Sequence, residues 1–76
     1  MPHVIVKLYP GRSQQQKQAL AEAVTRAVME TVGASEASVS VGIEDVTPGD
    51  WVARVWEPDI AAKPGQLFKK PGYDPT

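Results

Sequence analysis

The segment PHVIVKLYPGRSQQQ, residues 2–16, changes its hydrophobic period from two to about 3.6 within a few positions. Residues 2–9 alternate between apolar and mixed side chains, which predicts a β-strand. Pro10-Gly11 then ends the strand. Ser13 is a good helix N-cap, and Gln16 three residues later completes a capping box, so a helix is expected to begin here.

Outward from this segment, the pattern predicts one β-α-β unit. Apolar residues from Leu20 onward recur at helical spacing, and Gly33 stands where a C-cap glycine belongs, so the helix spans about 13–32. Residues 38–44 alternate again, which predicts a second strand. A strand, a helix and a strand in so short a unit imply a right-handed crossover and parallel pairing. The predicted fold class is therefore α/β (α+β).

The carboxy-terminal third gives weaker signals. Thr47-Pro48-Gly49-Asp50 predicts a turn, and residues 51–56 are interpreted as a short third strand or hairpin arm. A short second helix is predicted to start at Pro58-Asp59, although Pro64-Gly65 weakens it. No linker or repeat divides the chain, so residues 1–76 are expected to form a single domain.

Composition excludes several classes of protein. The 76 residues include no cysteine and one histidine, so neither a thiolate nor an all-imidazole metal site is possible. The net charge is −1 and no basic stripe is present, which argues against nucleic-acid binding. No apolar run reaches membrane-spanning length, and the amino terminus lacks a signal-peptide pattern, which indicates a cytoplasmic protein.

Size and topology together predict an oligomer. A domain of this length buries only about 60% of its unfolded surface and is marginally stable alone. A single β-α-β unit also leaves two edge strands and one uncovered sheet face. A partner chain that covers them is the physical expectation.

Four features follow one another along the chain: a proline directly after Met1 that opens a strand, Gly11-Arg12-Ser13 before a helix, a second strand, and Trp51. Their order and spacing resemble the 4-oxalocrotonate tautomerase family. The resemblance covers residues 2–51, and residues 69–73 resemble the longer dimeric members, which act as phenylpyruvate-type tautomerases. It implies a β-α-β unit that assembles into dimers or hexamers, with a dimer favoured. It also implies isomerisation of a 2-oxo acid or its enol without metal or organic cofactor.

The resemblance implies that Pro2 is the acid–base catalyst once Met1 is removed. An α-amino group has an unperturbed pKa of roughly 8, and burial in an apolar pocket lowers it towards neutrality. If Met1 is retained, the nitrogen of Pro2 is an amide and accepts no proton. On residue pattern alone, Pro2 is better explained as a residue that begins a strand.

The remaining candidate residues are substrate-binding. Arg12 matches the family position that binds the substrate carboxylate, which suits its planar, bidentate guanidinium. Trp51 and Leu8 match residues that line the pocket. Ser40 stands where the family has a second arginine, so a monocarboxylate such as phenylpyruvate is favoured. Arg54 is a candidate substitute cation.

Each candidate also has a structural interpretation. Lys70 is a second candidate for the substitute cation. The alternative for Arg12, Arg54 and Lys70 is that each is a surface charge, and the alternative for Trp51 is a core or interface residue. His3 faces away from Pro2, and the adjacent Glu44-Asp45 face opposite ways, so neither is expected to be catalytic. The competing functions are a catalytically weak binding protein, an assembly module and a hydrolytic dehalogenase relative.

Overall fold

The computed structural model describes all 76 residues and divides them into two compact units, Met1–Asp45 and Val46–Thr76. The first unit contains the strands β1 (His3–Leu8) and β2 (Ser40–Asp45), the helix α1 (Gln14–Val32) and a single 3₁₀ turn, η1 (Glu36–Ser38). The second contains only helical elements: η2 (Pro48–Asp50), η3 (Val52–Ala61) and η4 (Pro64–Gln66). The expectation of a single domain over residues 1–76 stays a prediction.

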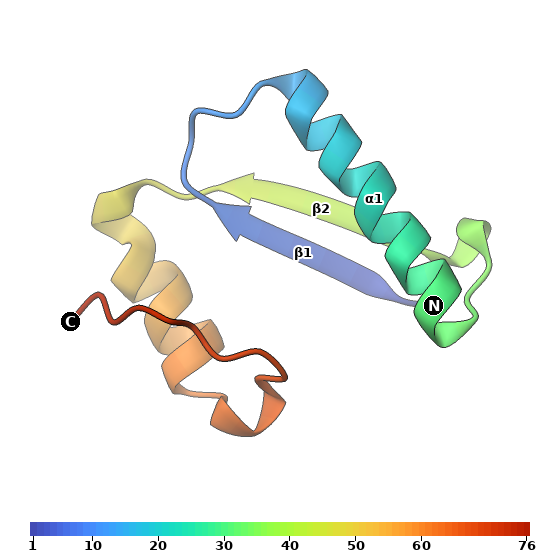
Figure 1. Ribbon diagram of the computed structural model, residues 1–76. Coiled ribbons are helices and arrows are strands. Elements are labelled where there is room, and N and C mark those ends of the chain that lie inside the picture. Colours follow the sequence, from blue (N-terminus) through green and yellow to red (C-terminus); the bar gives the residue numbers. More distant parts are fainter. The chain divides into compact units, whose positions relative to one another are not determined.

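The first unit is the predicted β-α-β unit (Figure 1). Strands β1 and β2 pair in parallel, and the register runs from His3 opposite Ser40 to Leu8 opposite Asp45. The small α+β class and the parallel pairing expected from the sequence are confirmed.

Helix α1 begins and ends where the sequence predicts. The Ser13 hydroxyl accepts the backbone N–H of Gln16 at 3.1 Å, and the Gln16 side chain accepts the Ser13 N–H at 2.9 Å. Gly33 ends the helix with φ of 74°, a left-handed conformation that glycine adopts without a Cβ penalty. The capping box fixes the start of α1 directly after Arg12, and the C-cap fixes the end of the helix.

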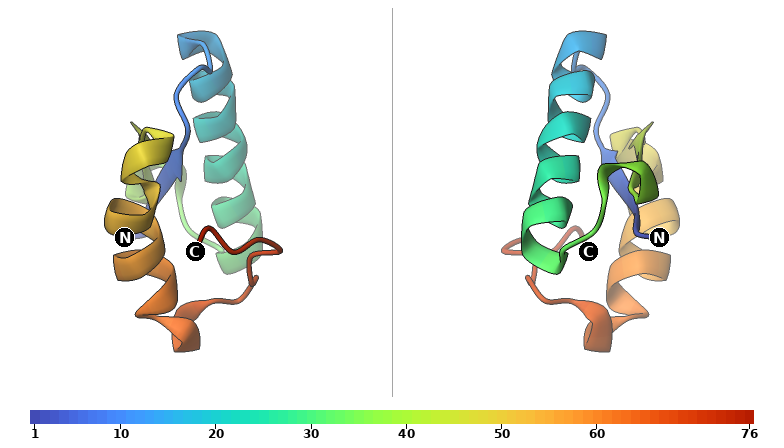
Figure 2. Two further views of the ribbon diagram at one scale, coloured as in Figure 1. Left: turned by 90° about the vertical axis from the view of Figure 1, so that its left-hand side faces the viewer. Right: turned by 90° about the vertical axis from the view of Figure 1, so that its right-hand side faces the viewer.

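Helix α1 covers one face of the strand pair (Figures 1 and 2). Lys17 ties the helix to the end of β2 through an ion pair of 2.8 Å with Asp45. On β1, His3 and Ile5 are exposed and Leu8 is half-buried, as is Pro2 directly before the strand. No side chain of β1, α1 or β2 is fully buried, so this unit has an incomplete hydrophobic core.

The third strand predicted over residues 51–56 is wrong, because these residues begin the helix η3. Its less exposed positions fall in pairs at residues 51–52, 55–56 and 59–60, which is the spacing of a helix with one covered side. Val55 is buried, and so is Val46 ahead of the helix. The short apolar run looked strand-like because its helical period becomes visible only when Asp59 and Ile60 are included.

The helix start predicted at Pro58 is also wrong, because Pro58 lies inside η3. Proline has no N–H, and its ring clashes with the carbonyl four residues earlier in a regular α-helix. The turns of η3 are wider: the N–H of Ala62 donates to the carbonyl of Glu57, five residues back, at 3.1 Å. The wider π-type turn accommodates Pro58 without ending the helix.

Candidate active site

Pro2 lies directly before β1 and is held to β2. Its carbonyl accepts the backbone N–H of Ser40 at 3.1 Å, which extends the parallel ladder by one residue. Pro2 is half-buried, whereas Met1 is fully exposed. Leu8 is likewise half-buried at the other end of β1, six residues along and so on the same strand face as Pro2.

The opposite face of the strand pair carries a polar pair beside Pro2. Nδ1 of His3 and Oγ of Ser40 are 2.6 Å apart, and both side chains are exposed. His3 is therefore exposed, one of the two states expected for it. Asp45 is paired with Lys17, while its neighbour Glu44 points to the other face, so the two carboxylates form no acid–base pair.

Arg12 occupies the loop between β1 and α1, one residue before the N-cap. Gly11 precedes it with φ of 124°, a conformation that favours glycine and turns the chain into the helix. One guanidinium nitrogen of Arg12 donates to the carbonyl of Tyr9 at 3.3 Å. A guanidinium has five N–H donors, so this bond leaves a fork for a carboxylate.

Trp51 and Arg54 belong to the second unit. The indole Nε1–H of Trp51 donates to the hydroxyl of Tyr73 at 3.1 Å, and the Trp51 side chain is half-buried. Arg54 is exposed on η3, as is Lys70 in the tail. Tyr73 was not predicted as a site residue; the only signal for it in the sequence is its place in the segment 69–73 that resembles the longer family members.

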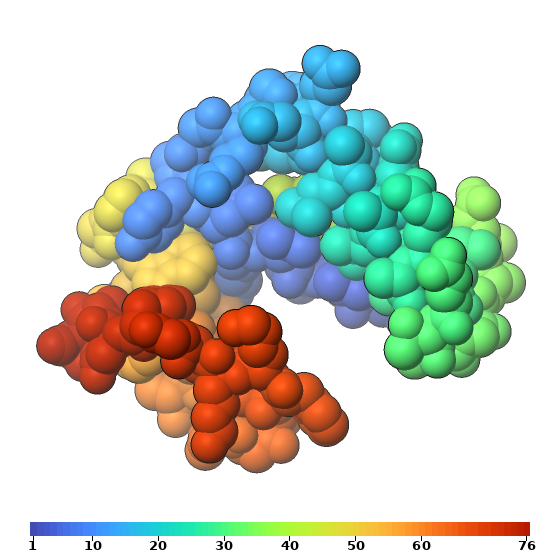
Figure 3. All heavy atoms as spheres, in the orientation of Figure 1, coloured from blue at the N-terminus to red at the C-terminus, as the bar shows by residue number.

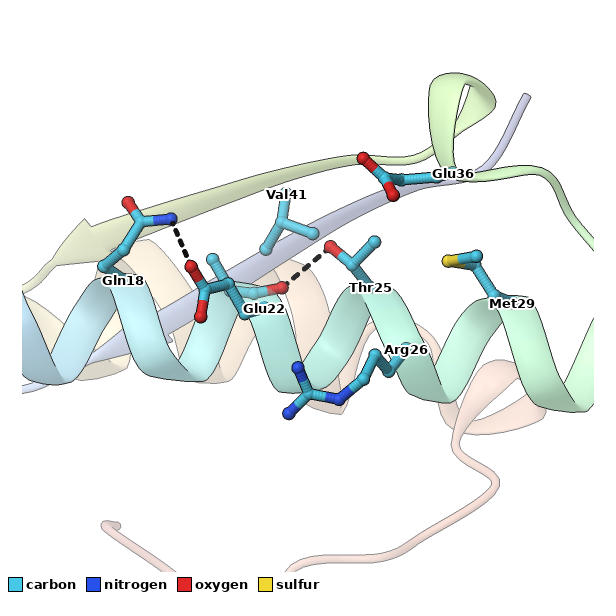
Figure 4. Close-up of a pocket in the computed structure, with 8 residues that line it drawn as sticks. Gln18, Glu22, Thr25, Arg26, Met29, Glu36 and Val41 are labelled. Carbon is cyan, nitrogen blue, oxygen red and sulfur yellow. Dashed lines mark hydrogen bonds between the residues drawn. The ribbon is translucent and has the colours of Figure 1, made fainter.

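A polar groove of about 530 Å³ lies between α1 and β2 (Figure 4). Gln18 donates to Glu22 at 3.4 Å, and the hydroxyl of Thr25 donates to the backbone carbonyl of Ala21 at 2.8 Å. A smaller hollow of about 270 Å³ lies under the first turns of α1 and is visible in the space-filling view (Figure 3). None of the predicted site residues lines either hollow.

The structure contains no group of three or more His, Cys, Asp or Glu side chains arranged to hold a metal ion. No helix combines the length and the apolar character needed to cross a membrane. The predicted site residues carry a guanidinium at Arg12, an indole at Trp51 and the ring nitrogen of Pro2, which is an amide while Met1 precedes it.

Residues 2–56 match the family model of the tautomerase enzymes. A probable tautomerase of Xylella fastidiosa (strain 9a5c) is 45% identical over 73 residues, which span 96% of this chain and 89% of that protein. The tautomerase PptA of Cronobacter sakazakii (strain ATCC BAA-894) is 40% identical over 75 residues, 97% of this chain and 99% of that protein.

Solved structures agree in fold. A 4-oxalocrotonate tautomerase isozyme of Methylibium petroleiphilum superimposes with a TM-score of 0.63 at 44% identity, over 66% of this chain and 81% of that one. TomN, a 4-oxalocrotonate tautomerase homologue of the tomaymycin biosynthetic pathway, also gives 0.63 at 42% identity, over 66% and 77%. The fold and the matched residues define a small isomerase. The chain belongs to the tautomerase family, in its 4-oxalocrotonate tautomerase branch, and is a keto–enol tautomerase.

Proposed function

We propose that this enzyme interconverts the enol and keto forms of a 2-oxo monocarboxylic acid of the phenylpyruvate type, with Pro2 as the acid–base group after removal of Met1. The observation that carries the proposal is the setting of Pro2. The residue is half-buried, is held to β2 through its carbonyl, and directly follows a fully exposed Met1. Removal of Met1 would leave a secondary amine at a fixed place beside the sheet.

The reaction is a proton transfer in two steps. The neutral Pro2 amine takes the proton from the enol hydroxyl, and electron density moves to C3 as the C2 carbonyl forms. The resulting ammonium returns a proton to C3, which restores the free amine. One proton leaves oxygen and one arrives at carbon, so the reaction needs no oxidant or reductant.

Arg12, Trp51 and Leu8 are proposed to bind the substrate. Arg12 has donors left for a carboxylate, and its charge stabilises the electron density that moves towards the carboxylate and carbonyl during the transfer. Trp51 and Leu8 are proposed to supply half-buried apolar surface that suits an aryl group. Ser40 provides no second cation, which favours a substrate with a single carboxylate. Arg54 is proposed to substitute for the second arginine of the family.

The decisive experiment follows the ultraviolet absorbance of phenylenolpyruvate with Met1-free protein, verified by intact mass. Pro2→Ala and a Met1-retaining sample of the same chain are run beside it. The proposal predicts rapid ketonisation by the trimmed protein and a large loss in both other samples. Equal rates in all three would exclude Pro2 as the base.

A catalytically weak binding protein is the second candidate, and Ser40 in place of an arginine is the observation that favours it. Such a protein would bind phenylpyruvate in a calorimeter but would not accelerate its ketonisation. Turnover that collapses in Pro2→Ala would reject this candidate. An assembly module without a ligand would neither bind nor turn over the acid.

The working form is proposed to be a cytoplasmic homodimer. The first unit has no fully buried side chain, and one face of its strand pair is not covered by α1 (Figure 2). A second copy would complete that core. Sedimentation should give twice the chain mass of 8.2 kDa, and a mass six times that of the chain would replace the dimer with a hexamer.

A further inference from the structure

Three aromatic side chains of the second unit form one cluster. The hydroxyl of Tyr73 accepts the indole N–H of Trp51 at 3.1 Å, and the ring of Tyr73 lies 5.4 Å from that of Trp56 at an interplanar angle of 53°. Trp51 and Trp56 flank the first turns of η3, whereas Tyr73 comes from the tail beyond η4. Tyr73 therefore connects the tail to the first turns of η3 through its contacts with Trp51 and Trp56.

We propose that Tyr73 is a positioning residue: it fixes the plane of the Trp51 indole and thereby sets the preference of the enzyme for aryl-bearing substrates. This inference rests on the proposed role of Trp51 as a wall of the substrate pocket. It assigns Tyr73 no contact with the reacting atoms.

The hydrogen bond is well suited to this task. An indole has a single donor, so the partner of Nε1 selects between ring orientations that apolar packing alone would allow. Trp51 is half-buried, and rotation of its ring would move Nε1 away from the Tyr73 hydroxyl. The orientation of the indole is thus coupled to the position of the tail.

Burial alone does not fix the orientation of the Tyr73 ring. Its side chain is 49% exposed, and the hydrophobic effect on the covered half is non-directional. The tilted contact with Trp56 falls in the range of favourable aromatic geometry, and it restrains the ring while the hydroxyl faces Trp51. These two directional contacts orient the residue.

Phe68 offers the matched control. It lies in the same tail and carries a phenyl ring, but it is fully exposed. Tyr73→Phe removes one hydroxyl and keeps the ring, so it tests the hydrogen bond without opening a cavity. Phe68→Ala removes an entire exposed ring from the same tail and leaves the contacts of Tyr73 with both tryptophans in place.

The test combines NMR with kinetics on the full-length, Met1-free protein. In Tyr73→Phe the indole N–H resonance of Trp51 should move, and kcat/KM for phenylenolpyruvate should fall about fivefold, the effect of one hydrogen bond. For enolpyruvate, which lacks the aryl group, kcat/KM should change less than twofold. Phe68→Ala should alter neither the resonance nor the ratio of the two substrates.

A double-mutant cycle separates positioning from general damage to the fold. In a Trp51→Phe background the indole donor is gone, so Tyr73→Phe should cause no further loss. An unmoved resonance, an unchanged substrate ratio or additive losses would overturn the proposal. If neither the wild-type protein nor any variant turns over either enol, the proposed function fails. The indole resonance then still reports whether the Tyr73 hydroxyl holds Trp51.

Discussion

His3 and Ser40 face each other across β1 and β2, with Nδ1 and Oγ 2.6 Å apart. They are the first residues of the two strands and are aligned in the parallel register. The backbone N–H of Ser40 is at the same time bonded to the carbonyl of Pro2. Ser40 thus contacts both residues that would open the trimmed chain, at the position where the family resemblance leads one to expect an arginine.

Substitution of Ser40 by arginine should widen the substrate range towards dicarboxylates. A guanidinium here adds a charge-assisted hydrogen bond to a second carboxylate, which corresponds to about a tenfold rise in kcat/KM for a dicarboxylate enol relative to phenylenolpyruvate. Steady-state kinetics with both substrates measures the ratio. Ser40→Gln controls for side-chain length, and a ratio unchanged in Ser40→Arg would remove this position from substrate selection.

Loss of the Arg12 guanidinium should weaken transition-state stabilisation. Arg12→Ala is expected to lower kcat/KM about tenfold to a hundredfold, and Arg12→Lys should recover part of it because a point charge replaces the fork. If the interaction forms only in the transition state, kcat falls by the same factor. Arg26→Ala, an exposed arginine on α1, is the control. Equal rates for Arg12→Ala and Arg26→Ala would contradict the role.

Removal of the N-cap should destabilise α1. Ser13→Ala deletes the acceptor for the N–H of Gln16 and is expected to lower the free energy of unfolding by about 1 kcal/mol, measured by urea denaturation. Ser35→Ala is the matched control, because Ser35 precedes η1 without making a side-chain cap bond. A similar loss in both variants would mean that the cap contributes nothing specific.

Acid should loosen the last residues of the tail. Asp74 accepts the hydroxyl of Thr76 at 2.6 Å and its N–H at 2.9 Å, and these bonds lower the pKa of the Asp74 carboxyl below its ordinary value of 3.8. The ordered tail is therefore favoured above that value and loses this advantage as the pH falls through the lowered pKa. Carboxyl NMR should show the Asp74 midpoint rise in Thr76→Ala. A midpoint unaffected by this substitution would contradict the assignment.

Most of the first unit could be predicted, although β2 begins at Ser40 rather than at residue 38 because Glu36–Ser38 form a 3₁₀ turn that was not predicted. Its signals are local: a period of two in β1, the Ser13–Gln16 capping box, and Gly33 after α1. The parallel pairing followed from topology, since a helix connects the two strands. Pro2 and Arg12 became candidate site residues through the family resemblance, because the local pattern alone favours a structural role for Pro2.

The second unit could not be predicted in the same way, because its structure depends on less regular features. Pro58 usually limits a regular α-helix, yet wider turns carry η3 past it. The partners of Trp51 could not be predicted either, since Tyr73 is 22 residues away and the pair rests on tertiary structure. Pairings of this kind leave no period in the sequence.

The fully exposed Met1 ahead of a fixed Pro2 has a practical consequence for anyone who produces this enzyme. Under the proposed mechanism the catalyst is made by a maturation event, the cut by methionine aminopeptidase. An affinity tag or a cloning scar fused ahead of Pro2 would keep its nitrogen an amide and leave the preparation inert. Specific activity would then report the fraction of chains that have lost Met1. A tag at the carboxy terminus would have to leave the contacts of Tyr73 with Trp51 and Trp56 intact.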